Sequence, residues 1–311
     1  MSGIDTAFRI ANNLRSNFAK VLLGKDFTVP LTAILGGGHI LCTDVPGVGK
    51  TVFSKIIARS FGCTYSRLQC TADLLPSDII GVNIYDQKRG EFEFKRGPIF
   101  SQILLADEIS RATPKAQSAL LECMEEHQVT VNGQTYPMNA PFLVIATQNP
   151  IEHEGTFPLP EAQLDRFMIS LDIGYPDPQS ECNMLTQQRL EHPLDSIAQI
   201  ASAEELAQAQ AEVRSVTVSS SITEYIVALV SFTRTSAHLS LGASPRGSQS
   251  LYRAAQALAA IQNRKYVIPD DVQMLAAAAL QHRVIPKRRF DRALARQAIE
   301  EALSTIPVPT A

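Results

Sequence analysis

A glycine-rich loop, DVPGVGKT at Asp44 to Thr51, constrains the fold of this chain more than any other part of the sequence. An apolar run, 39–43, comes before the loop, and a segment with helical periodicity, 51–58, comes after it. A strand, a glycine-rich loop and a helix in this order can bind phosphate, because the N–H groups of the loop and the N-terminus of the helix both point at the anion. The segment therefore predicts a nucleotide-binding α/β domain.

The side chains of the loop have separate expected roles. Lys50 would place its charge on the β- and γ-phosphates, and Thr51 would place its hydroxyl on a Mg²⁺ that bridges them. Asp44 takes the place of the first glycine of the pattern GxxxxGK[ST], and a carboxylate there repels phosphate unless it points outward. Taken alone, the loop is as compatible with an ordinary glycine-rich turn as with a phosphate site. The residues expected around the phosphates are Val45, Pro46, Gly47, Val48, Gly49, Lys50, Thr51 and Val52.

An acidic pair, Asp107 and Glu108, changes that balance. It follows the apolar run 103–106, as expected of a buried parallel strand that delivers acids to a ligand crevice at its carboxyl end. Asp107 would hold the Mg²⁺ through water, and Glu108 would orient and deprotonate the attacking water. For an isolated pair a solvated strand end is the favoured interpretation, but the phosphate loop upstream favours the catalytic one.

The composition is that of a globular protein with a substantial core. Of the 311 residues, 45% are hydrophobic and 19% are charged, which suits one large domain and a smaller one. No apolar run approaches the roughly 20 residues that span a bilayer. The first residues also lack a signal-peptide core, so we expect a cytoplasmic protein without a membrane anchor of its own.

Charge and cysteine content argue against several other kinds of site. The net charge of −3 provides no overall attraction to nucleic acid or to anionic lipid. The basic run 287–289 is expected to be a solvated connector. The five cysteines have no paired metal-ligand spacing and are expected to be reduced thiols. The segment Glu152-His153-Glu154 is expected to be a loop rather than a metal site.

Strands and helices are expected to alternate up to about residue 175. The predicted strands are 33–43, 65–70, 103–107, 142–147 and 168–173, and the predicted helices are 4–23, 51–58 and 114–127. Such a sheet is parallel and covered by helices on both faces, with the ligand outside the carboxyl ends of the strands. Two hairpins are expected to be added to it, at 81–94 and at 129–138. The second surrounds Asn132-Gly133, which suits a type I′ turn.

A domain boundary is expected near residues 175–178, where two prolines punctuate the chain and the alternation ends. From about Glu181 onward we expect a bundle of four to five helices. The chain would thus divide into a core, 1–178, and a smaller helical domain, 179–311. The predicted helix starts are the capping boxes Ser202 with Glu205 and Ser221 with Glu224, and the prolines Pro245 and Pro269.

Three long segments narrow the assignment. ILLADEISRATPKAQSALLECMEE, ATQNPIEHEGTFPLPEAQLDRF and GASPRGSQSL resemble the MoxR family of AAA+ ATPases, and the resemblance extends over about residues 5–285. It implies a P-loop NTPase fold with a parallel five-stranded αβα core and an all-α lid, an insert in helix 2 at about 71–100, and ATP and Mg²⁺ as ligands. Asp44 departs from the family pattern, as does Ser110, where the family usually has asparagine; both leave the predicted catalytic residues intact.

The resemblance also implies roles for side chains outside the phosphate loop. Asn149 matches sensor 1, which holds the attacking water or the γ-phosphate. Arg166 matches the arginine finger, which reaches the γ-phosphate of the neighbouring subunit; alone, it would more often be an arginine of an intrachain ion pair. Arg246, in the first turn of a lid helix, matches sensor 2 and could return toward the nucleotide. Arg111 matches an arginine of the family, but the sequence does not decide whether it acts across an interface.

An arginine that acts across an interface requires a closed assembly, so the resemblance implies a homohexameric ring. Family members commonly remodel, activate or assemble client complexes together with von Willebrand factor A domain proteins. The DxSxS pattern of that domain is not evident in this sequence, so such a partner would be a separate protein. In relatives the helix-2 insert points toward the pore or a client. Two alternatives stay open: a DNA-directed motor or loader, and a slow nucleotide-gated adaptor, which Asp44 favours.

Overall fold

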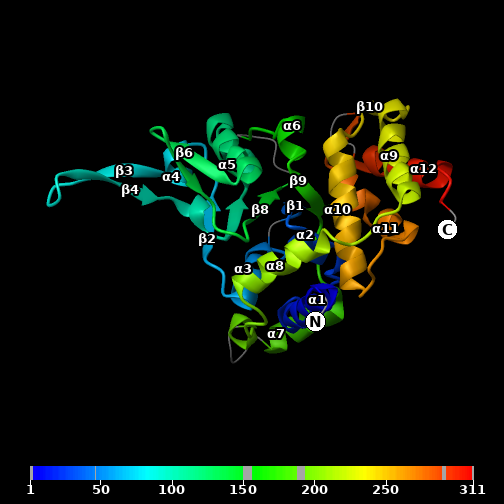
Figure 1. Cartoon of the computed structure of the whole chain (residues 1–311), viewed down its shortest axis with the longest axis horizontal. Helices are drawn as coiled ribbons and strands as arrows, with labels where there is room; N and C mark the ends of the chain where they lie inside the picture. Colours follow the sequence, from blue (N-terminus) through cyan, green and yellow to red (C-terminus); the bar gives the residue numbers. More distant parts are fainter. Residues whose placement is uncertain (1–2, 46, 150–155, 188–192, 289–291, 310–311) are drawn as a thin grey trace.

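The computed structural model describes residues 3–45, 47–149, 156–187, 193–288 and 292–309. Figure 1 shows a core built around a sheet, a group of helices beside it, and a long hairpin that projects from the core on the opposite side. Within the described residues, no helix combines the length and apolar character needed to cross a membrane.

The central sheet has five parallel strands in the order β2-β5-β8-β1-β9. All residues of β1 are buried, and so are the first four of β5, as expected for strands covered on both faces. Strand β8 lies between β1 and β5, so the carboxyl ends of these three strands are adjacent. The strands are β1 (His39–Thr43), β2 (Tyr65–Gln69), β5 (Ile103–Asp107), β8 (Leu143–Gln148) and β9 (Phe167–Leu171).

Alternate side chains of the strands enter two hydrophobic clusters. Ile40 and Cys42 face the first cluster, whereas Leu41 faces the second, which is the two-residue period of a strand. The first cluster contains α1 (Gly3–Val21), α2 (Thr28–Gly36) and α3 (Lys50–Phe61). The second contains α5 (Pro114–Glu126) and residues next to α4 (Pro76–Ile80) and α6 (Glu161–Leu164). The five-stranded αβα core predicted from the sequence is therefore confirmed.

Six α-helices follow the core in the described part of the chain. Helix α8 packs against α1 and α2, α10 packs against α2, and α11 packs against β9. The first hydrophobic cluster is consequently continuous between the core and these helices. The division at residue 178 stays a prediction. The helices are α7 (Pro178–Gln187), α8 (Ala203–Val213), α9 (Ser220–Thr235), α10 (Pro245–Ile261), α11 (Pro269–Leu280) and α12 (Arg292–Thr305).

Both predicted hairpins are present. Strands β3 (Gly81–Asp86) and β4 (Glu91–Arg96) form the projection seen in Figure 1. Strands β6 (Gln128–Val131) and β7 (Gln134–Pro137) are joined through Asn132 and Gly133, whose φ angles of 51° and 80° fit the predicted type I′ turn. The two hairpins meet where the ring of Phe94 stacks on that of Tyr136, with ring centroids 4.6 Å apart.

Three predictions of local structure were wrong. Residues 33–36 belong to helix α2 rather than to the first strand, because TVPLTAILG is apolar on nearly every side and has no period that distinguishes a buried helix from a strand. Helix α9 is capped by Ser219, whose hydroxyl accepts the N–H of Ile222 (3.2 Å), and not by Ser221. The helical part also contains one more helix than expected and a short ribbon, β10 (Leu239–Leu241) with β11 (Ile285–Pro286).

A buried ion pair joins the helical part to the core. Arg283, after α11, donates to the carboxylate of Asp165 at 2.5 Å and to the Ser250 hydroxyl at 2.7 Å. Its guanidinium also donates to the carbonyl of Phe167. Ser244, the cap of α10, donates to the second oxygen of Asp165 (2.5 Å). The Arg283 side chain is only 1% exposed, and burial lowers its pKa. His282 also donates to the Phe167 carbonyl, at 2.9 Å. Three side chains of the helical part, those of Ser244, His282 and Arg283, thus hold the segment 165–167.

We expect Arg283→Met to lower the free energy of unfolding by about 3–5 kcal/mol, because the carboxylate of Asp165, whose side chain is only 13% exposed, then lacks its cation. The double variant Asp165→Leu with Arg283→Met should be less destabilised than the single variant, since it removes both charges. Urea denaturation of the three proteins measures the effect. Equal losses for the single and double variants would show that the ion pair is not what the single substitution disrupts.

A second buried polar group, His39 on β1, is fixed in one tautomer. Its Nδ1 accepts the N–H of Val144 (3.0 Å), so Nε2 carries the proton and donates to the Met124 carbonyl (3.1 Å). Burial lowers the pKa of His39 to about 4, and nearby His127 acts in the same direction. The folded protein therefore keeps this imidazole neutral well below the pH at which an exposed histidine is protonated.

His39 should make the folded state less stable in weak acid. Between pH values of about 6.5 and 4 the unfolded chain binds a proton that the folded chain does not, so the free energy of unfolding falls as pH falls, by up to about 1.4 kcal/mol per pH unit. His39→Gln, whose amide can still accept and donate, should show a shallower loss between pH 7 and pH 5. Urea denaturation at both pH values tests this, and parallel losses in the two proteins would contradict it.

Candidate nucleotide site and arginine pocket

The glycine-rich loop connects β1 to α3 in a conformation that requires its glycines. Gly47 and Gly49 have φ angles of 87° and 93°, in the left-handed region, and Gly49 caps the N-terminus of α3. A Cβ atom on Gly47 would meet no atom within 4 Å, so the loop is open on that side. Pro46 lies outside the described residues. The open loop and the helix N-terminus together can accept an anionic group.

Asp44 is buried, with 7% of the residue exposed, and its carboxylate forms hydrogen bonds within the protein instead of facing the loop opening. It accepts the N–H groups of Val45 (2.8 Å) and Gly174 (2.6 Å), while the Asp44 carbonyl accepts from Lys50 Nζ (2.8 Å). Asp44 is not among the residues that line the cavity in front of the loop. The repulsion that the sequence suggested is therefore reduced, because this carboxylate is turned into the protein.

A cavity of about 360 Å³ lies in front of the loop. It brings together Lys50, Thr51, Asp107, Glu108 and Asn149, which the sequence had assigned to one site. Val45 and Val48 do not line it but pack on the first hydrophobic cluster. The complete lining is Gly47, Gly49, Lys50, Thr51, Val52, Arg67, Asp107, Glu108, Thr147 and Asn149. The strand order accounts for this grouping, since the ends of β1, β5 and β8 are neighbours.

Thr147, near the end of β8, connects the two acids. Its hydroxyl donates to Oδ1 of Asp107 (2.7 Å) and accepts the N–H of Glu108 (2.8 Å). Glu108 has φ 57° and ψ 51°, a left-handed conformation that is costly for a residue other than glycine and is often found at functional sites. The sequence analysis did not identify Thr147, although its position two residues before Asn149 places it close to the same strand end.

Residues of the edge strand β2 also contact the acids, and the sequence analysis did not identify them. Arg67 forms an ion pair with Oδ2 of Asp107 (2.6 Å), and Gln69 Nε2 donates to Oε2 of Glu108 (3.2 Å). Arg111 adds a further ion pair to Glu108 (3.3 Å). Arg67 and Gln69 share a face of the strand because they are two residues apart, but their contact with the acids depends on the pairing of β2 with β5, which this spacing does not show.

The residues that line the cavity fit a nucleotide with a magnesium ion. The Thr51 hydroxyl and the Asp107 carboxylate are the oxygen ligands that Mg²⁺ prefers. Among the described residues there is no cluster of three or more His, Cys, Asp or Glu side chains placed to hold a metal. A hydroxyl and a carboxylate are the kind of protein ligands with which Mg²⁺ binds while it keeps several waters and contacts phosphate.

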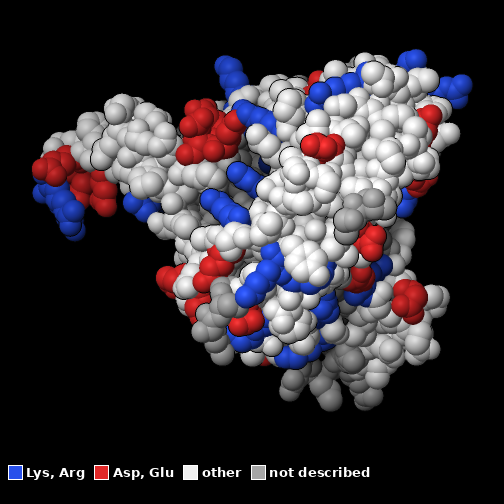
Figure 2. Space-filling view, turned by 45° about the vertical axis from the view of Figure 1, so that its right-hand side comes forward, with Lys and Arg blue, Asp and Glu red and all other residues white. Residues whose placement is uncertain are grey.

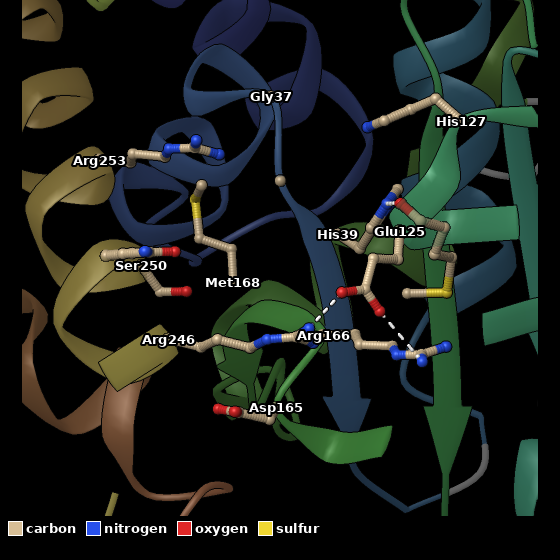
Figure 3. Close-up of a pocket in the computed structure, with 13 residues that line it drawn as sticks. Gly37, His39, Glu125, His127, Asp165, Arg166, Met168, Arg246, Ser250 and Arg253 are labelled. Atoms are coloured by element: carbon tan, nitrogen blue, oxygen red, sulfur yellow. Dashed lines mark hydrogen bonds and ion pairs between the residues drawn. The ribbon is translucent and has the colours of Figure 1, made fainter. Parts of the chain in front are cut away.

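Arg166 and Arg246 lie together in a different pocket, of about 200 Å³, which we call the arginine pocket. Its lining shares no residue with the lining of the nucleotide cavity. Glu125 on α5 points between the two arginines and forms an ion pair with each, at 3.0 Å for Arg166 (Figure 3). Neither arginine therefore lines the phosphate site of its own chain. The complete lining is Gly37, Gly38, His39, Met124, Glu125, His127, Asp165, Arg166, Met168, Arg246, Gln249, Ser250 and Arg253.

Comparison with known proteins agrees with this geometry. The family described as "ATPase family associated with various cellular activities (AAA)" matches residues 39–169, and the AAA lid domain matches residues 231–302. The chain is similar to a crystal structure of an ATPase candidate from Cytophaga hutchinsonii, with a TM-score of 0.88 and 39% identity over 98% of both chains.

Three curated relatives are similar over most of their length. Protein YeaC of Bacillus subtilis is 48% identical over 93% of this chain and 92% of its own. Chaperone MoxR1 of Mycobacterium tuberculosis is 43% identical over 86% of this chain and 73% of its own. Protein MoxR of Paracoccus denitrificans is 32% identical over 94% of both chains. With its parallel core, its lid and its phosphate loop, this chain belongs to the MoxR family of AAA+ ATPases.

Proposed function

We propose that this ATPase works as a homohexameric ring in which each ATP is hydrolysed between two subunits, and that the ring remodels, activates or assembles a client protein complex. The observation that carries the proposal is the separation of the phosphate cavity from the arginine pocket. A complete hydrolytic site with arginines on the γ-phosphate then requires the arginine pocket of a second copy. A contact between two different surfaces, repeated around an axis, generates a ring.

On the phosphate side, the loop N–H groups and Lys50 would bind the β- and γ-phosphates. Thr51 and Asp107 would hold Mg²⁺, which supplies charge neutralisation on the phosphates when bound. To hold the ion, Asp107 would give up its ion pair with Arg67. Glu108, held by Gln69 and Arg111, would orient the attacking water and accept its proton. The products are ADP and inorganic phosphate.

Asn149 and the two arginines would complete the set of side chains that stabilise the transition state. Asn149 lines the cavity and would position the attacking water or the γ-phosphate. Arg166 and Arg246 of the neighbouring subunit would contact the equatorial oxygens, where negative charge is spread as the bond to the leaving group breaks. Since Arg246 belongs to the lid and Arg166 to the core, this contact would also link the lid angle of one subunit to the phosphate state of the next.

Mg²⁺-dependent phosphate release from ATP should rise with protein concentration more steeply than in direct proportion.

We expect Glu108→Gln to lower the rate about 100-fold or more, because the general base is lost. Arg166→Ala should lower it by about 1000-fold, and Arg246→Ala should act in the same direction. Lys50→Ala should lose nucleotide binding. Arg296→Ala, which removes an exposed arginine of α12, is the matched control and should match wild type.

A mixture of Lys50→Ala and Arg166→Ala subunits gives the sharper test. Each variant lacks one half of the proposed shared site, so mixed rings regain intact sites and the mixture should be more active than either protein alone. A rate proportional to protein concentration, with no recovery on mixing, would count against hydrolysis between subunits.

The β3–β4 hairpin is the proposed contact with the client. Its apolar side chains are unusually exposed, with Phe92 at 72% and Tyr85 at 52%, and their rings pair across the two strands. Figure 2 shows the projection as mainly uncharged, with acidic and basic side chains gathered at its tip. A relative at 43% identity is named a chaperone, and exposed apolar side chains on a projecting element suit contact with a protein client.

A separate von Willebrand factor A domain protein is the proposed partner. The proposed location is the cytoplasm, where ATP is available.

The double variant Tyr85→Ser with Phe92→Ser should keep basal ATP hydrolysis and lose client contact. Reduced α-lactalbumin, which aggregates, serves as the unfolded probe, and light scattering measures protection against its aggregation. Lys88→Ser, at the tip of the same hairpin, is the control and should protect as wild type does. Full protection by the double variant would remove the hairpin from this role.

A further inference from the structure

Glu125 joins two arginines that come from separate parts of the fold. It lies in the last turn of α5, Arg166 directly precedes β9, and Arg246 is in the first turn of α10. Each carboxylate oxygen contacts one guanidinium: Oε2 contacts Arg166 Nη2 at 3.0 Å, and Oε1 contacts Arg246 Nη2 (Figure 3). One acidic side chain therefore brings together the two arginines proposed to act on a neighbouring nucleotide.

The carboxylate contacts guanidinium donors that a phosphate group would also use. Carboxylate and phosphate are both recognised by guanidinium groups through paired oxygens, so they compete for the same donors. The arginine pocket adds Arg253 from the same face of α10, seven residues after Arg246. A second anion could therefore enter the pocket and take over the arginines from Glu125.

One buried arginine nitrogen in this pocket has no hydrogen-bond partner among the described residues. This nitrogen is the Nε of Arg166. A buried donor without a partner is unfavourable and favours an additional acceptor. The side chains of Glu125, Arg166 and Arg246 are 34%, 26% and 45% exposed, respectively, and ion pairs between partly exposed groups are weak enough to be exchanged.

We propose that Glu125 is a positioning residue that holds Arg166 and Arg246 in reserve until the γ-phosphate of a neighbouring ATP replaces it. This inference rests on the proposed hydrolysis between subunits. ADP has no γ-phosphate, so Glu125 keeps the arginines when the neighbour holds ADP. With ADP nothing displaces the carboxylate, so Glu125 opposes assembly most strongly in that state. With ATP the γ-phosphate must first displace the carboxylate, so the charge of Glu125 also raises the protein concentration at which rings form with ATP.

The test uses the hydrolysis-blocked background Glu108→Gln with ATP and Mg²⁺, so that assembly is measured apart from turnover. Sedimentation velocity over a protein dilution series gives the concentration of half-maximal assembly. We expect Glu125→Gln to lower this concentration at least threefold, since the arginines no longer have to leave a charged partner. Glu125→Ala, which also lacks the charge but differs in shape, should shift it in the same direction. Glu126→Gln, the adjacent exposed acid, is the control and should leave it unchanged.

ATP turnover by Glu125→Gln in a chain that retains Glu108 shows whether the substitution acts on assembly or damages the hydrolytic site. At saturating protein concentration Glu125→Gln should hydrolyse ATP within about twofold of wild type, because its effect lies in assembly. Half-maximal assembly at the concentration found for the Glu108→Gln parent, or above it, in both Glu125 variants would overturn the role of Glu125. If Arg166→Ala in the Glu108→Gln background assembles with ATP as readily as its parent and retains full turnover in the active background, the proposed shared site itself fails.

Discussion

The position of β8 between β1 and β5 is the constraint on which the nucleotide site depends. It sets the phosphate loop, the acidic pair and Asn149 side by side although they are far apart in the sequence. It also places Thr147 where one hydroxyl can donate to Asp107 and accept from Glu108. In a parallel sheet these ends must meet at one edge, so strand order alone turns three separated segments into one cavity.

The sequence predicted those parts of the fold and site that depend on local pattern. The phosphate loop, the acidic strand, the Asn-Gly hairpin and the cap at Ser202 each carry their signal within a few residues. Helix α2 was missed because an apolar segment buried on all sides has no period to detect. Arg67, Gln69 and Glu125 were missed for another reason: their roles come from partners distant in sequence, which only the folded chain brings near.

The location of Arg246 shows how motif and geometry contribute different information. Its motif identified a lid arginine, but the motif does not state which nucleotide that arginine reaches. The packing of α10 on α2 and the buried pair of Arg283 with Asp165 fix the lid so that Arg246 faces Glu125 and Arg166. The same ion pair secures the chain on both sides of Arg166, since Asp165 and Phe167 are both bound by residues after α11.

Asp44 illustrates how a departure from a motif can have a structural use. A glycine at this position would have no side chain, whereas the carboxylate here joins the start of the phosphate loop to Gly174 in the segment that leaves the core. The start of the loop at Asp44 and Val45 is consequently held by protein contacts before any ligand arrives. Less conformational entropy is then lost when a nucleotide binds, and affinity for the nucleotide depends less on contacts made by the ligand itself.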